Sequence, residues 1–170
     1  MKKIYVILLI LFLTPMAQAL ELKSDTLIKG EYIDKQYTGE GLDVSPPLNW
    51  SGIPEGTKSF ALICDDPDAP VGTWVHWVMY NIPPYIKELG EAIPADEVLI
   101  DGSLQGKNDF GRIGYGGPMP PPGKPHRYFF KLYALDTLLD VKPGLTKSQL
   151  LEVINGHILT QVQLVGKYKR

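Results

Sequence analysis

The hydrophobic pattern of the chain predicts a mostly β protein. Segment 59–66 has a continuous apolar centre, which is typical of a buried strand. Segment 72–82 is rich in aromatic and β-branched residues, and it is predicted to be a central strand because both of its faces are largely apolar. Segments 127–136 and 160–168 alternate between apolar and polar residues, which predicts two further strands.

The same alternation assigns side chains to the faces of these strands. In segment 72–82, one face takes Trp74, His76, Val78 and Tyr80, and the other takes Val75, Trp77, Met79 and Asn81. In segment 127–136, one side takes Tyr128, Phe130, Leu132 and Ala134.

The clearest helical pattern covers residues 146–158. Thr146 followed three residues later by Gln149 is a capping-box start. The apolar stripe of this helix is expected to consist of Leu150, Leu151, Ile154 and Ile158. Short strands punctuated by proline and glycine suit two packed sheets with one or two peripheral helices.

Residues 1–19 are predicted to form a signal peptide. A basic start, an apolar run over 4–13 that is too short to span a bilayer, and the small-residue ending Ala17-Gln18-Ala19 favour this interpretation over a retained membrane anchor. Cleavage there leaves residues 20–170, which have the size of one domain. The predicted location is the periplasm or the outside of the cell.

Charge and cysteine content narrow the class of protein. Without Lys2 and Lys3, the mature chain has 15 basic and 19 acidic side chains, a net charge of −4. An acidic chain without a basic run argues against nucleic acid and against broad adhesion to anionic membranes. Cys64 is the only cysteine, so no internal disulfide can form, and its apolar surroundings predict a buried side chain.

The first segment with candidate chemistry is D-P-D-A-P, residues 66–70, followed by W-V-H-W. Its prolines restrict the backbone, so Asp66 and Asp68 are held with little freedom. A tight turn that uses these carboxylates for backbone N–H groups is the simpler interpretation, and one aspartate could do that while the other faces a pocket. His76 is either a hydrogen-bonded core residue or a site residue whose ring nitrogen binds an aspartate, which would favour the protonated form.

The second segment, residues 114–128, combines glycines and prolines before His126. Glycines allow backbone N–H groups to approach a ligand, and prolines limit the entropy lost when the wall is ordered. The alternatives are a stiff surface loop or a proline-rich ligand for another protein. His126 begins the later strand after a rigid loop, so the argument made for His76 applies to it as well. The two segments are therefore expected to form two walls of one anion pocket.

Several motifs of known enzymes are incomplete in this chain. Residues 109–111 spell D-F-G, but the other protein-kinase motifs do not accompany them. No G-x-S-x-G elbow or Walker loop occurs, and the three histidines fit no local zinc spacing. The segments therefore indicate binding before catalysis, with neither a metal nor a cofactor expected.

Taken together, these motifs resemble the phosphatidylethanolamine-binding protein family, also called Raf kinase inhibitor-like proteins. The resemblance lies in D-P-D-A-P, then W-x-H-x-x-x-x-N-I-P, then G-P-x-P-P-x-G-x-x-H-R-Y, and it covers nearly all of residues 20–170. The run N-D-F-G-R-x-G-Y-G-G-P and the ending L-V-G-K-Y-K-R are similar to the bacterial branch. Met119 stands where many bacterial relatives have cysteine, so the rim of the pocket should be more apolar.

The resemblance implies a large antiparallel sheet packed on a smaller one, with peripheral helices. It also implies a small cavity at one end of the sheets that takes phosphate, phosphorylated head groups or similar anions. Carried over by motif, the ligand-binding residues are Asp66, Asp68, Pro70, Trp74, His76, Tyr115, Gly116, Gly117, Pro118 and His126, with Tyr128 as a further candidate. Members of the family generally act by binding and are not enzymes.

Three functions follow as hypotheses. The first is an exported binding protein for a small anion or a phospho-headgroup. The second is an interaction module that inhibits a protease or a kinase, in which a protein is the partner and the pocket is secondary. The third and least favoured is a hydrolase that uses Asp66 and His76, with or without a metal. The sequence leaves open whether the protein is a monomer or a homodimer.

Overall fold

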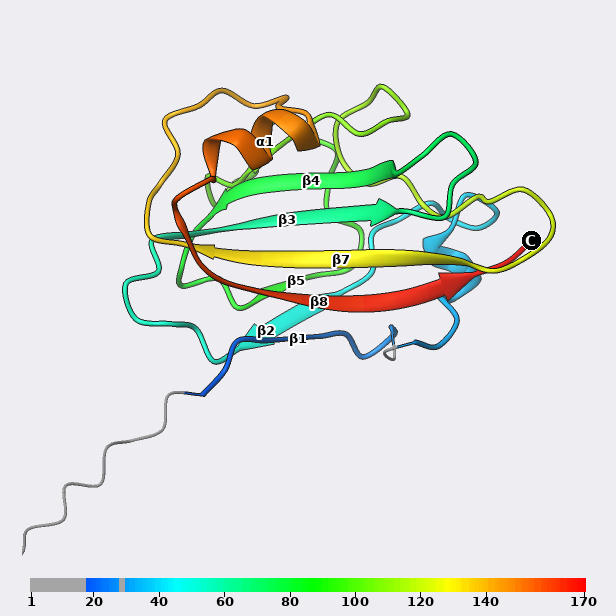
Figure 1. Cartoon of the computed structure of the whole chain (residues 1–170), viewed down its shortest axis with the longest axis horizontal. Helices are drawn as coiled ribbons and strands as arrows, with labels where there is room; N and C mark the ends of the chain where they lie inside the picture. Colours follow the sequence, from blue (N-terminus) through cyan, green and yellow to red (C-terminus); the bar gives the residue numbers. More distant parts are fainter. Residues whose placement is uncertain (1–17, 28–29) are drawn as a thin grey trace, which may run out of the picture.

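Two antiparallel sheets form the body of the protein in the computed structural model, which describes residues 18–27 and 30–170 (Figure 1). The larger sheet has the order β6-β4-β3-β7-β8, from β6 (Leu104–Gln105), β4 (Trp74–Ile82), β3 (Ser59–Asp66), β7 (His126–Leu135) and β8 (Ile158–Tyr168). The smaller sheet has the order β1-β2-β5, from β1 (Glu21–Lys23), β2 (Leu48–Ser51) and β5 (Glu88–Leu89). The expected fold class is confirmed. Residues 1–17 of the expected signal peptide lie outside the described residues.

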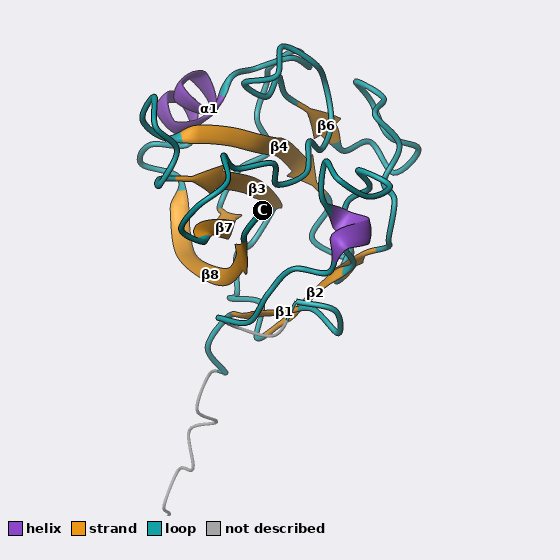
Figure 2. Ribbon diagram, turned by 90° about the vertical axis from the view of Figure 1, so that its right-hand side faces the viewer, coloured by secondary structure: helices purple, strands orange, loops and turns teal. Residues whose placement is uncertain are grey.

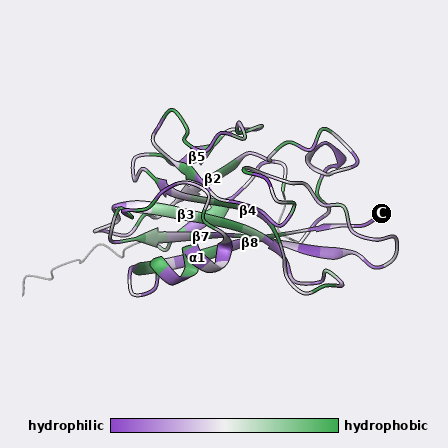
Figure 3. Ribbon diagram, turned by 90° about the horizontal axis from the view of Figure 1, so that it is seen from above, coloured by the Kyte–Doolittle hydropathy of each residue, from purple (hydrophilic) through white to green (hydrophobic). Residues whose placement is uncertain are grey.

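The larger sheet is covered on both faces, as the view from above shows (Figure 3). One face packs on the smaller sheet, and the other packs on the helix α1 (Lys147–Val153). A single turn of 3-10 helix, η1 (Lys35–Tyr37), lies near the end of the sheets where β8 finishes (Figure 2). Tyr128, Phe130, Leu132 and Ala134 all enter the core between the two sheets, which confirms the alternation predicted for β7.

The alternation predicted for β4 is confirmed from Trp77 to Tyr80 but is wrong at Val75, because a β-bulge interrupts the strand. Val75 and Trp77 pair with consecutive residues of β3, so His76 between them has no partner in that ladder. Trp77 therefore faces the smaller sheet, whereas Val75 packs with Val78 on the side of the helix. A period of two cannot predict an extra residue, and this extra residue is the histidine of the candidate site.

The predicted helix begins correctly but ends too late. Thr146 caps α1 and forms the reciprocal capping box with Gln149. The helix ends at Val153, because Gly156 adopts a left-handed conformation with φ of +86° and turns the chain back toward the sheet. Ile158, which was assigned to the apolar stripe, instead begins β8 and pairs with Leu135.

A buried carboxylate joins the helix to the sheet. Asp65 in β3 is a fully buried residue, and both of its carboxylate oxygens lie 2.8 Å from the ammonium of Lys131 in β7. Lys147, the first residue of α1, forms a second ion pair with Asp65. One carboxylate thus holds two cations from two different elements, which offsets the desolvation of its charge.

Replacing Asp65 and replacing the lysines that bind it should lower the free energy of unfolding by different amounts. Replacing Asp65 by asparagine should lower the free energy of unfolding by about 2 kcal/mol, less than for a fully buried pair because both lysines can still reach water. Lys131→Met and Lys147→Met should each cost less, since one cation still compensates the carboxylate. The double variant should cost more than the two single variants together, as measured by urea unfolding. Additive costs would contradict this account.

Candidate functional site

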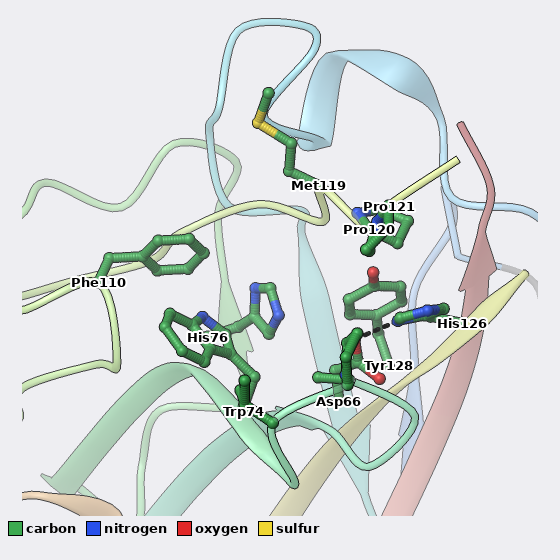
Figure 4. A pocket seen from close by; sticks show the side chains of 12 residues that line it. Asp66, Trp74, His76, Phe110, Met119, Pro120, Pro121, His126 and Tyr128 are labelled. Carbon is green, nitrogen blue, oxygen red and sulfur yellow. Dashed lines mark hydrogen bonds and ion pairs between the residues drawn. The ribbon is translucent and has the colours of Figure 1, made fainter. Parts of the chain in front are cut away.

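The two segments with candidate chemistry meet at one end of the larger sheet. β3 ends at Asp66, and its antiparallel neighbours β4 and β7 begin at Trp74 and His126, so all three residues lie at the same end (Figure 1). A cavity of about 200 Å³ opens there. It is lined by Asp66, Ala69, Pro70, Val71, Trp74, His76, Phe110, Met119, Pro120, Pro121, His126 and Tyr128 (Figure 4).

Asp66 serves both as a turn residue and as a pocket residue. One of its carboxylate oxygens accepts from the backbone N–H of Asp68 at 2.8 Å, and the other lies 2.8 Å from Nδ1 of His126 (Figure 4). Because a carboxylate oxygen accepts, His126 carries a proton on Nδ1 in this pair. The bond joins the end of β3 to the start of β7 and leaves Nε2 of His126 for other partners.

His76 has a different partner from the one expected. Its Nδ1 lies 2.6 Å from the carbonyl oxygen of Gly116, which can only accept, so Nδ1 carries the proton and Nε2 is left for a ligand. The expectation of an aspartate bonded to this ring is wrong, and Asp66 is bonded to His126 instead. Burial lowers the pKa of His76 from its ordinary value, although the bond to Gly116 and the nearby carboxylates of Asp66 and Asp109 oppose that shift.

Aromatic rings form the walls beside His76. The Phe110 ring packs edge-on against Trp74 and His76, with ring centroids 5.5 and 5.4 Å apart, and Tyr128 packs on His76 at 5.1 Å. Asp109 holds this wall in place, because its side chain accepts from the backbone N–H of Val75 at 2.7 Å. Asp109 and Phe110 belong to the incomplete kinase-like motif and to the run that resembles the bacterial branch, but neither pattern predicted their place at the site.

Tyr128 presents a buried hydroxyl group to the cavity. The residue is only 1% exposed, and within the part of the chain that the structure describes its hydroxyl has no hydrogen-bond partner. The hydroxyl points toward Pro120 and Pro121 across the pocket (Figure 4). Burial, together with the nearby charge of Asp66, raises the pKa of Tyr128 far above its ordinary value, so the group remains an O–H donor.

The structure divides the ten residues expected at the site into two groups. Five of them line the cavity: Asp66, Pro70, Trp74, His76 and His126. The other five support it from outside: Asp68, Tyr115, Gly116, Gly117 and Pro118. Of these, Asp68 binds Arg127, the hydroxyl of Tyr115 donates to the backbone of Tyr37, and the carbonyl of Pro118 accepts from Gly39.

Two glycines of the second segment, Gly116 and Gly117, allow close packing and do not direct their N–H groups at a ligand. The N–H of Gly116 donates to the carbonyl of His76, and the N–H of Gly117 donates to the Asp43 carboxylate. A Cβ at position 117 would lie 2.7 Å from the backbone of Thr38, and one at position 116 would lie 2.6 Å from the ring of Phe110. The role expected for these two glycines is therefore corrected.

The rim of the cavity is apolar. Val71 is 79% exposed and Met119 is 52% exposed, and the edge of Phe110 also reaches solvent. Within residues 18–27 and 30–170, no three histidine, cysteine or acidic side chains lie close enough to hold a metal ion. Over the same residues, no helix has the length and apolar character needed to cross a membrane.

Replacing His76 by asparagine should make stability less sensitive to acid. The pKa of His76 in the folded protein is below the ordinary value of 6.5 that the unfolded chain retains. Between these two values the unfolded chain binds the extra proton, so the wild type loses stability as the pH falls through this window. Asparagine can donate to Gly116 without titrating. Urea unfolding at about pH 7 and about pH 5 should show a smaller loss for the variant, and an equal loss would contradict this.

Known proteins with similar sequences and structures identify the family. The sequence model of the phosphatidylethanolamine-binding protein family matches residues 23–169. A UPF0098 protein of Methanothermobacter thermautotrophicus is 54% identical over 138 residues, which is 81% of this chain and 91% of that protein. A UPF0098 protein of Aquifex aeolicus is 50% identical over 153 residues, which is 89% of each chain.

Two solved structures agree with this assignment. YbcL of Escherichia coli, described as a member of the mammalian PEBP family, superposes with a TM-score of 0.83 at 36% identity. A PEBP homologue from Chlamydia trachomatis superposes with a TM-score of 0.82 at 40% identity. In each comparison 89% of this chain and 98% of the other are covered. This chain therefore belongs to the phosphatidylethanolamine-binding protein family.

Proposed function

We propose that this protein binds a small anion, such as phosphate or a phosphorylated head group, in the cavity beside Asp66, His76, His126 and Tyr128. The observation that carries the proposal is the hydroxyl of Tyr128, a buried donor that has no partner within the described residues. A buried polar group without a hydrogen bond is costly, and an acceptor oxygen of a bound ligand would remove that cost. The family's name supports a phosphorylated head group as the ligand class.

The other donors converge with Tyr128. Nδ1 of His126 already donates to Asp66, so Nε2 donates to a ligand when the ring carries a second proton. The aromatic and proline walls limit the ligand to a small group and give it less polar surroundings than water, which strengthens each hydrogen bond. None of the twelve lining residues is a serine, threonine or cysteine, so the cavity offers no hydroxyl or thiol of the usual nucleophiles.

His76 should make the affinity depend on pH. In its neutral form Nε2 presents a lone pair, which repels the oxygen of an anion, so binding needs a proton at that nitrogen. The proton can come from solvent, which charges the ring, or from a ligand that is itself protonated. A bound anion in turn raises the pKa of His76 and partly reverses the effect of its burial.

Removing the hydroxyl of Tyr128 should separate binding from stability. Tyr128→Phe should weaken the binding of phosphoethanolamine by about tenfold, because one hydrogen bond to a charged group is lost. The variant should be at least as stable as the wild type, since the free protein no longer buries an unsatisfied hydroxyl. Calorimetric titration and urea unfolding measure the two effects.

Tyr133→Phe is the matched control for that experiment. Tyr133 lies on the same strand, but it packs on the face that carries helix α1 and takes no part in lining the cavity. Removing the hydroxyl of Tyr133 should leave the affinity for phosphoethanolamine unchanged. The proposal fails if Tyr128→Phe binds phosphoethanolamine as tightly as the wild type.

Sulfate can test the proton at His76, because it does not titrate in the neutral range. Its affinity for the wild type should rise as the pH falls from about 8 to about 5, and most steeply below the ordinary pKa of histidine, since the pKa of His76 is lowered. His76→Asn should flatten this dependence. Equal slopes in the two proteins would rule out His76 as the titrating group.

We also propose that the protein is exported and works in the periplasm or outside the cell. The support is the N-terminal pattern of residues 1–19.

The apolar rim around the cavity, with Val71 and Met119 exposed, favours a protein partner as the second candidate function. In that case the partner would cover the rim, and an anion in the cavity would modulate its binding.

A further inference from the structure

A second cavity adjoins the first and shares one residue with it. It measures about 560 Å³ and is lined by Tyr32, Asp68, Lys124, Pro125, His126, Arg127 and Lys167. His126 is the residue common to the two cavities. His126 therefore lies at the boundary between the small pocket beside Tyr128 and a larger cavity whose lining is rich in cationic side chains.

The charges of the second cavity are not balanced. Arg127 is neutralised by Asp68, which accepts from its backbone N–H, its Nε and its Nη2 at 2.7 to 2.9 Å. Lys124 and Lys167 form no ion pair with any residue that the structure describes. The whole chain has a net charge of −2, so this excess of positive charge is local and runs against the overall balance.

The two lysines come from different parts of the chain, and the backbone of each is restricted in a different way. Lys167 lies near the end of β8, where its N–H donates to Glu31 at 2.9 Å and its carbonyl accepts from Ile33 at 2.7 Å. These bonds place Tyr32 beside Lys167. Lys124 precedes Pro125 in the loop before β7, and proline restricts the conformations of the residue before it.

We propose that the second cavity is an anion subsite, and that the ligand of this protein carries two anionic groups. One group occupies the small pocket beside Tyr128, and the other lies between Lys124 and Lys167, with His126 between them. This proposal rests on the proposed function and specifies its ligand class. Lysine supplies a point charge without fixed geometry, so the second group can be a phosphate or a carboxylate.

The experiment compares ligands that differ in the second charge alone. Phosphonocarboxylates, from phosphonoacetate to phosphonohexanoate, are titrated beside alkylphosphonates of matched length, which covers a range of spacings between the two groups. At least one phosphonocarboxylate should bind about tenfold more tightly than its matched alkylphosphonate. The double variant Lys124→Gln/Lys167→Gln should remove most of this gain, while its affinity for the alkylphosphonate changes much less.

Lys58→Gln controls for a general effect of charge. Lys58 is exposed and directly precedes β3, at the end of that strand opposite to Asp66. The Lys58→Gln variant should therefore keep the gain in affinity of the phosphonocarboxylate over the alkylphosphonate. The subsite is refuted if no phosphonocarboxylate exceeds its matched alkylphosphonate, or if the gain survives in the double variant or falls equally with Lys58→Gln. If the alkylphosphonates themselves do not bind to the wild type, the proposed function fails, and the inference fails with it.

Discussion

The pairing of β3 with both β4 and β7 is the constraint on which the rest of the structure depends. These contacts are antiparallel, so the end of β3 meets the starts of its two neighbours, and residues far apart in the sequence come together. The bond between Asp66 and His126 closes this end of the sheet. On one face the strands bury their apolar side chains against the smaller sheet, and on the other against α1. The open end is thus left for polar groups.

The polar groups at this end differ in how completely they are satisfied. Asp66 and Nδ1 of His76 have partners within the protein, which fixes their orientation. The hydroxyl of Tyr128 has none among the described residues. A protein that minimised only its own free energy would satisfy or remove such a group. The contrast indicates that the site combines polar groups of fixed orientation with one buried hydroxyl that lacks a hydrogen-bond partner among the described residues.

Much of the fold could be predicted from the sequence, because its main strands carry strong local patterns. The core face of β7 follows from simple alternation, and the start of α1 follows from Thr146 and Gln149. The end of α1 was missed because the apolar spacing continues past a glycine that turns the chain. The two segments of the site were found through their unusual residues. Phe110 was missed because an isolated aromatic residue in a loop carries no local signal of what it covers.

Hydrogen-bond partners were beyond the reach of sequence reasoning. The charges of Asp66 and Asp109 act on His76, yet Asp66 bonds to His126 and His76 bonds to the carbonyl of Gly116. The role of the glycines at positions 116 and 117 was also beyond the reach of sequence reasoning. Glycine is needed there because of Phe110 and Thr38, which are distant in sequence.

The bulge at His76 also separates the evolution of the pocket from that of the core. Deleting His76 would restore a regular ladder in which Val75 and Trp77 become neighbours and still point to opposite sides of the sheet. Loss of the histidine by deletion would therefore leave the apolar packing of both layers in place and remove a polar group from the pocket. The extra residue is thus required by the site and not by the core.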